Sequence, residues 1–337
     1  MSLPRTTRTA LIILLTITWG SWLLFMTIGE RWGLFADNWF MSLTMAGGSF
    51  IAGATSEGGG AVAFPVMTLG FGIPPSVARD FSLMIQAVGM IAAGFTILLT
   101  RIRIEHHALL YSGIGGAVGI VLGLEYVAPH LPPAYAKMFF TATWLSFAFA
   151  LYWINRYRDR EVHEGITNFL PRHGVLLFFC GIIGGVITSI TGSGLDITTF
   201  AVLVLRLRIT ETIATPTSVV LMGINALVGA LWKGAFRGDL APEAWAYWWV
   251  CVPIVVLGAP MGARFIRDRS RLFVATILYS SILVQSVAAF AIVPQTPRLL
   301  GFTGAIFVLG LLFFRRLANR GVRRLSWLSA EGIAPKT

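Results

Sequence analysis

Long apolar segments recur along almost the whole chain, and they constrain its fold more than any other feature. Ten of them have at least the roughly 18 residues that a helix needs to cross about 30 Å of hydrocarbon. Only 12% of the residues are charged, whereas about 25% is typical of soluble domains. The sequence therefore predicts an all-α polytopic membrane protein with roughly eight to ten full transmembrane helices. The ten segments are 9–29, 39–56, 78–100, 107–127, 134–154, 173–191, 212–234, 244–265, 271–292 and 297–315.

Two shorter apolar segments, 61–72 and 196–207, each follow a glycine cluster, at 58–60 and at 192–194. A helix of about 12 residues reaches only about 18 Å, which is too short to cross the membrane. A glycine break followed by a half-length helix favours a re-entrant hairpin or a broken span. Such backbone is tolerated at membrane depth only where protein or a water-filled cavity satisfies it. Which of the two arrangements holds is left open by the sequence.

The net charge of +11, from 26 Lys and Arg against 15 Asp and Glu, is best explained by membrane orientation. With the N-terminus inside, 20 basic residues fall in cytoplasmic connections and tails. This asymmetry predicts that both termini are cytoplasmic. We expect a multi-pass protein of the bacterial inner membrane. The partners it implies are membrane lipids, and no nucleic acid is needed to explain the charge. The six basic residues on the outer side are Arg31, Arg79, Lys137, Lys233, Arg237 and Arg298.

An internal repeat is indicated by a shift of 136 residues, which aligns 48–101 with 184–237 and gives 11 identical pairs. The charge pattern places the two glycine-broken hairpins on opposite sides, so the repeats are expected to be inverted. In inverted-repeat transporters the substrate lies near the midplane, where half-helix N-termini face anions. The predicted divisions are an extra span (1–38), a first repeat (39–155), a linker (156–172), a second repeat (173–293), an extra span (294–316) and a basic tail (317–337).

The first glycine break also carries a family resemblance. The segment 57–65, with its three glycines and Pro65, followed by Gly-Ile-Pro-Pro-Ser-Val-Ala at 72–78, resembles the TauE/SafE family. The second repeat has a weaker match at 192–194 and 214–218. The resemblance implies a carrier of sulfite, organosulfonates or related oxyanions. The chain departs from the family pattern at Arg79-Asp80, at the acids of both glycine turns, and in its additional terminal spans.

The candidate site residues are polar groups, glycines and charges beside the two breaks. A charge inside the membrane is costly, so each needs an explanation. Glu57 and Asp196 are candidates for coupling transport to H⁺ or Na⁺, or they accept hydrogen bonds from helix N-terminal amides. Arg79 either forks two hydrogen bonds to an oxyanion or pairs with Asp80 or Glu57. The predicted substrate-binding set is Gly58, Gly59, Gly60, Arg79, Ser82, Gln86, Gly192, Ser193, Gly194, Ser218 and Asn225.

The polar members of this set have a second interpretation. Ser82 and Gln86 share one face of a helix, as do Ser218 and Asn225. Such a stripe suits an oxyanion cavity, but it serves equally well for hydrogen bonds between helices. The sequence does not decide between these roles.

Catalytic motifs are missing from the sequence. It contains no HExxH and no Walker A lysine loop, so neither a cofactor nor an enzymatic activity is predicted. The five histidines fall in loops or at span ends, where we expect them to be solvated. The leading hypothesis is therefore a secondary transporter of a small sulfur-containing anion, working by alternating access with H⁺ or Na⁺ as an additional partner. The alternatives are an anion channel and a carrier of a small carboxylate.

Overall fold

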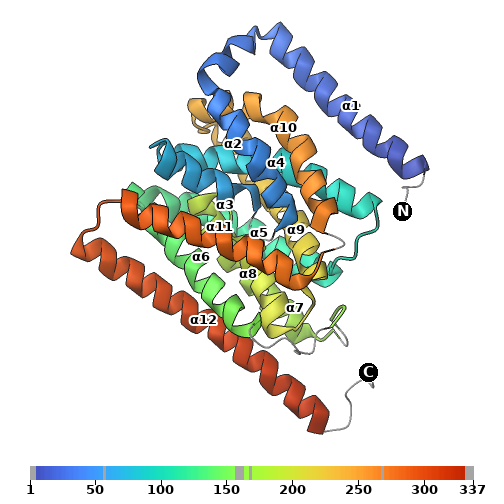
Figure 1. Ribbon diagram of the computed structural model, residues 1–337, viewed down its shortest axis with the longest axis vertical. Helices are drawn as coiled ribbons and strands as arrows, with labels where there is room; N and C mark the ends of the chain where they lie inside the picture. The colour runs from blue at the N-terminus through green and yellow to red at the C-terminus, as the bar shows by residue number, and fades with distance from the viewer. Residues whose placement is uncertain (1–4, 56–57, 156–162, 167–168, 267–268, 331–337) are drawn as a thin grey trace.

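The computed structural model describes residues 5–55, 58–155, 163–166, 169–266 and 269–330. Within these ranges the chain forms twelve α-helices and no β-strand (Figure 1). Five of the helices begin with proline, whose fixed φ suits the first helical turn and whose missing N–H costs nothing there. The helices are α1 (Arg5–Ile28), α2 (Leu34–Ala54), α3 (Gly58–Pro65), α4 (Pro75–Leu99), α5 (His106–Tyr126), α6 (Pro133–Asn155), α7 (Pro171–Thr191), α8 (Leu195–Ala201), α9 (Glu211–Leu231), α10 (Pro242–Ile266), α11 (Arg271–Ile292) and α12 (Pro297–Ala330).

Eight helical segments within the described residues are long and apolar enough to cross a membrane, and they confirm the polytopic all-α class. They belong to α1, α4, α5, α7, α9, α10, α11 and α12. The remaining long helices, α2 and α6, have 21 and 23 residues but are not among the eight. The predicted segments 39–56 and 134–154 thus form helices of spanning length, with a weaker apolar signal.

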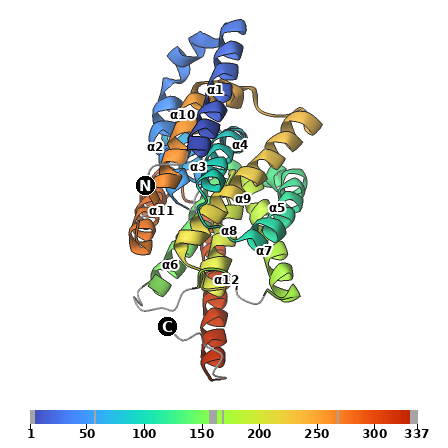
Figure 2. The ribbon, with the colours of Figure 1, turned by 90° about the vertical axis from the view of Figure 1, so that its right-hand side faces the viewer.

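The first and last long helices lie at the edges of the molecule, at opposite ends of its long axis (Figures 1 and 2). Only 11% of the apolar window of α1 and 17% of that of α12 are buried, against 67% for α4. A hydrogen bond of 2.8 Å from Trp22 Nε1 to the carbonyl of Trp249 ties α1 to α10. Such apolar, unburied surfaces fit helices that face lipid.

Both short segments consist of a one- to two-turn α-helix followed by a π-helical turn, at Val66–Gly70 after α3 and at Val202–Arg206 after α8. The two turns lie 136 residues apart and end in the same way. A residue with positive φ follows each, Gly72 at 65° and Arg208 at 58°. Matching backbone hydrogen bonds close them, at 2.9–3.1 Å: Phe71 N to Val66 O with Ile73 N to Met67 O, and Leu207 N to Val202 O with Ile209 N to Leu203 O.

Two extensively packed helix pairs, α2 with α10 and α5 with α7, make contact through glycines. A methyl group at Gly53 would overlap the carbonyl of Ala259, and one at Gly115 would overlap that of Phe178. Small residues allow this approach, which favours helix association where lipid offers no hydrophobic driving force. At the centre α9 crosses α4, and a methyl group at Gly223 would lie 3.0 Å from backbone atoms of α4. These contacts fix the positions of α4, α5 and α9, whose ends form the site.

The linker between the two halves is held by hydrogen bonds over its described residues. His163 N donates to Arg208 O at 2.7 Å, and Thr210 N donates to His163 O at 3.0 Å. Ile166 N donates to the buried carboxylate of Glu105 at 3.0 Å. This segment therefore joins the start of α5 to the start of α9.

The expectation of solvated histidines is wrong for His173. This residue is 4% exposed, and its Nδ1 accepts a hydrogen bond of 3.2 Å from Leu170 N. His173 thereby caps the N-terminus of α7, a role that its position at a span end did not reveal.

Candidate functional site

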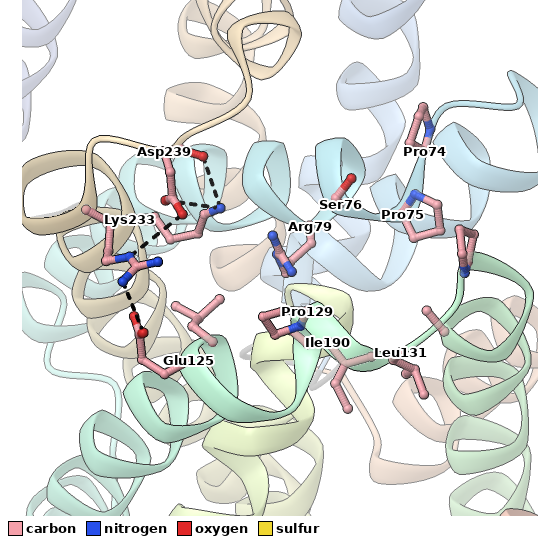
Figure 3. Close-up of a pocket in the computed structure, with 15 residues that line it drawn as sticks. Pro74, Pro75, Ser76, Arg79, Glu125, Pro129, Leu131, Ile190, Lys233 and Asp239 are labelled. Carbon is pink, nitrogen blue, oxygen red and sulfur yellow. Dashed lines mark hydrogen bonds and ion pairs between the residues drawn. The ribbon is translucent and has the colours of Figure 1, made fainter.

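A hollow of about 350 Å³ opens between the start of α4, the end of α5, the turn before α6 and the end of α9 (Figure 3). Ile190, in the last turn of α7, also lines it. We call this hollow the vestibule. Its charged lining residues are Arg79, Glu125, Lys233, Arg237 and Asp239. The vestibule thus gathers three of the six basic residues that the charge pattern assigns to the outer side.

Arg79 projects from α4 into the vestibule, opposite Pro129 and Ile190 (Figure 3). Its Nε and Nη2 donate to Asp80 Oδ1 at 3.0 and 2.9 Å. The Arg79–Asp80 ion pair, one of the two predicted alternatives, is therefore present. A guanidinium has five N–H donors, so this pair leaves three that can face an anion in the vestibule.

Asp80 also binds the second half of the chain. Its Oδ2 accepts from Lys233 Nζ at 3.1 Å and from Ala241 N at 3.2 Å. Asp80 is 2% exposed, and the side chain of Lys233 is 10% exposed. The carboxylate therefore joins two nearly buried cations, one from each half, to the connection between α9 and α10.

A second, more exposed group of charges lies at the other side of the vestibule. Glu125 accepts from Trp232 Nε1 at 2.8 Å and pairs with Arg237 at 3.3 Å. Asp239 pairs with Lys233 at 3.3 Å, with its own side chain 49% exposed (Figure 3). These pairs are partly exposed to solvent, so each contributes little to stability.

Below the vestibule, the turn between α7 and α8 packs against α4. Gly192 has φ 81°, a left-handed conformation, and its carbonyl accepts from Gln86 Nε2 at 2.6 Å. A methyl group on Gly192 would overlap Ser82 and lie 3.3 Å from the carbonyl of Arg79. Three of the predicted residues, Ser82, Gln86 and Gly192, are thus brought together near the backbone of Arg79.

The rest of this turn is stabilised internally. Thr191 Oγ1 donates to Ser193 O at 2.7 Å, and Ser193 Oγ donates to Asp196 Oδ2 at 2.8 Å. Asp196 lies in the first turn of α8, after Gly194, and is 1% exposed. Asp196 Oδ2 thus accepts from the Ser193 hydroxyl, and both interpretations of Asp196 stay predictions.

Several buried polar atoms around this turn have no hydrogen-bond partner among the described residues. A buried polar atom without a partner costs about 1–3 kcal/mol, and native proteins contain few of them. Five such atoms belong to predicted site residues. They are Ser82 Oγ, Gln86 Oε1, Asp196 Oδ1, Asn225 Nδ2 and Asn225 Oδ1.

The other predicted site residues lie outside this turn, in α9 and at the start of α3. Asn225 lies beside α8, because a methyl group at Gly116 would touch both Leu195 and Asn225. Ser218 donates to Thr215 O at 2.8 Å within its own helix. Gly58, Gly59 and Gly60 form the first turn of α3. Glu57 lies outside the described residues.

The sequence interpretation missed Lys233, Glu125 and Asp239 as members of the site. The charge pattern treats Lys233 and Arg237 only as markers of orientation, although Lys233 lies at the end of the apolar segment 212–234 and Arg237 closely follows it. Glu125 lies near the end of an otherwise apolar segment, and such an intramembrane charge is a functional signal by itself. Among the described residues, no three His, Cys, Asp or Glu side chains are grouped to hold a metal ion.

Comparison with known proteins agrees with the resemblance seen in the glycine break. The family model described as sulfite exporter TauE/SafE matches residues 40–289, from α2 to near the end of α11. No curated protein and no solved structure matches the chain. The matched region includes both short helices, the vestibule and the Gly192 turn, and leaves out α1 and α12. The chain belongs to the TauE/SafE sulfite exporter family of membrane transport proteins.

Proposed function

We propose that the protein is a secondary transporter that carries a small sulfur-containing oxyanion, such as sulfite or an organosulfonate, by alternating access. The observation that carries this proposal is the position of Arg79. Its guanidinium lies in the vestibule, while its backbone carbonyl would lie 3.3 Å from a methyl group on Gly192, in the buried turn. One helix turn therefore connects an anion-attracting cation to a cluster of unpaired polar groups.

The chemistry of these groups suits a compact oxyanion. The free N–H donors of Arg79 can bind two oxygens of a sulfite or sulfonate group in the forked geometry that guanidinium favours. The hydroxyl of Ser82 and the amide nitrogen of Asn225 are buried donors without partners among the residues that the structure describes. They can replace the water that the anion loses on leaving the vestibule.

The two halves, we further propose, are inverted repeats with both termini in the cytoplasm of a bacterial cell. The matching π-helical turns, 136 residues apart, support the repeat. The packing of α2 on α10 corresponds to that of α7 on α5, because a shift of about 136 residues relates α2 to α7 and α5 to α10. The basic residues then place the vestibule on the outer side of the inner membrane.

Labelling of single cysteines tests this orientation. Asp239→Cys at the vestibule and Glu164→Cys in the linker have exposed side-chain positions, at 49% and 77%. The native Cys180 and Cys251 are buried and give little background. A membrane-impermeant maleimide on intact cells is expected to label Asp239→Cys and to spare Glu164→Cys. The reverse pattern would invert the orientation, and labelling of both would contradict the topology.

For coupling, we propose that Asp196 carries a proton together with the anion. It is almost fully buried, and the structure gives it Ser193 as a side-chain partner and no ion pair among the described residues. A negative charge on a buried carboxylate is energetically unfavourable. Binding of a proton neutralises Asp196 and removes this cost. A membrane potential of 100 mV opposes anion uptake by about 2.3 kcal/mol per charge. One proton removes that penalty for a monovalent anion.

Uptake of labelled sulfite into proteoliposomes, with and without an inward proton gradient, tests coupling. We expect the gradient to raise wild-type accumulation several-fold and to have no effect on Asp196→Asn, which keeps the size of the side chain. Asp37→Asn, in the first turn of α2, is the control and should respond like the wild type. A wild type that is indifferent to the gradient, or an Asp196→Asn variant that responds fully, would exclude this role.

A further inference from the structure

We propose that Asp80 is a positioning residue, which holds two cations of the vestibule in place and sets how strongly they attract the transported anion. This inference rests on the proposed function, because it concerns the strength of the anion site. Asp80 does not line the vestibule. It acts through Arg79 and Lys233, which do.

The contacts of Asp80 differ from those of an ordinary helix-end ion pair. Its carboxylate accepts four hydrogen bonds or ion pairs of 2.9–3.2 Å, two from Arg79, one from Lys233 and one from Ala241 N. The two oxygens are divided, with Arg79 on Oδ1 and Lys233 on Oδ2. The carboxylate therefore fixes the spacing between a cation of α4 and a cation that follows α9.

The charges have a direct consequence for anion affinity. Asp80 supplies one negative charge for two nearly buried cations, so Arg79, Asp80 and Lys233 together carry one unit of net positive charge. The remaining charged residues of the vestibule, Glu125, Arg237 and Asp239, are more exposed. Because Asp80 and its two cations are nearly buried, solvent screens their net charge weakly. A stronger field would bind the anion too tightly for rapid release, and a weaker one would not capture it. Asp80 therefore balances capture against release.

Glu164 offers a control outside the vestibule. It pairs with Arg103, and both side chains are exposed, at 77% and 70%. Exposed ion pairs change energies little. Removing the charge of Glu164 should therefore leave anion binding nearly unchanged, although an arginine loses its partner.

The experiment measures the concentration of sulfite that half-saturates the rise in melting temperature of the purified protein, at constant ionic strength with chloride as the reference anion. For Asp80→Asn, which keeps acceptor and shape, we expect this concentration to fall by about fivefold or more and transport turnover to slow. Asp80→Glu should stay near the wild type, and Glu164→Gln should shift by less than about twofold. A purely structural role predicts the opposite for Asp80→Asn, namely weaker binding together with lower stability.

Lys233→Met is a second variant for the same binding measurement, and it keeps the test possible if Asp80→Asn does not fold. It removes one of the two cations and leaves the Arg79–Asp80 pair, so the half-saturating sulfite concentration should rise by about fivefold or more. An unchanged value in Lys233→Met, or unchanged or weaker binding in folded Asp80→Asn, would overturn the role of Asp80 alone. A wild type that sulfite does not stabilise beyond chloride would overturn the proposed function, and this inference with it.

Discussion

Replacing Arg79 with Gln is expected to lower kcat/KM for sulfur-oxyanion transport by about 100-fold. Hydrogen bonds to charged groups contribute about 1.5–3 kcal/mol each, and every 1.4 kcal/mol corresponds to about a tenfold change. Gln lacks both the charge and the fork that can bind two oxygens. The variant should also melt at a lower temperature, because Asp80 would keep its buried charge with one cation fewer. Uptake of labelled sulfite by proteoliposomes, together with a melting curve, measures both effects.

A double variant separates the two consequences of this change. Arg79→Gln combined with Asp80→Asn removes both members of the buried pair, so the melting temperature should return toward that of the wild type while transport stays low. Arg79→Lys keeps the charge without the fork and should retain intermediate transport. Wild-type transport in folded Arg79→Gln would remove Arg79 from the anion pathway.

Replacing Gly192 with Ala is expected to abolish transport and to lower the melting temperature markedly. The residue has φ 81°, which costs an alanine about 1–2 kcal/mol. The added methyl group would also overlap Ser82. The turn would then have to move off α4 and lose the hydrogen bond of Gln86 to its carbonyl. The readouts are sulfite uptake and thermal unfolding in detergent.

Gly72→Ala is the matched control for this prediction. Gly72 has a similar φ of 65°, but no atom lies within 4 Å of the position of an added methyl group. At the equivalent place in the second half, Arg208 tolerates a φ of 58°. Gly72→Ala should therefore lose a little stability and keep transport. Equal loss in both variants would show that backbone strain, not the contact with α4, is what matters at Gly192.

The helices could be predicted from the sequence to within a few residues, because hydrophobic length is a local property. The predicted segment 78–100 corresponds to α4, which spans 75–99, and 61–72 corresponds to α3 with its π-helical turn, 58–70. The largest difference is at the C-terminus, where α12 continues to Ala330 instead of ending near 315. Its basic stretch contains Gly321 but no proline, so the helix extends beyond the apolar span.

The site could be predicted only in part. The turn with Gly192 and the stripe of Ser82 and Gln86 were accessible, because glycine breaks and helical spacing are visible in the sequence. The vestibule was not, since it forms where the ends of α4, α5 and α9 meet. That Asp80 joins Arg79 to Lys233 depends on a contact between residues more than 150 positions apart, which no local pattern encodes.

Counterflow of labelled sulfite is the most direct test of the central claim, that this chain carries a small sulfur oxyanion by alternating access. Proteoliposomes loaded with unlabelled sulfite should accumulate the label transiently and saturably. Loading with isethionate should support the exchange, and loading with acetate or lactate should not. Exchange driven by carboxylates alone would indicate a carboxylate carrier. Non-saturating flux with single-channel currents would indicate an anion channel, and either result would contradict the account.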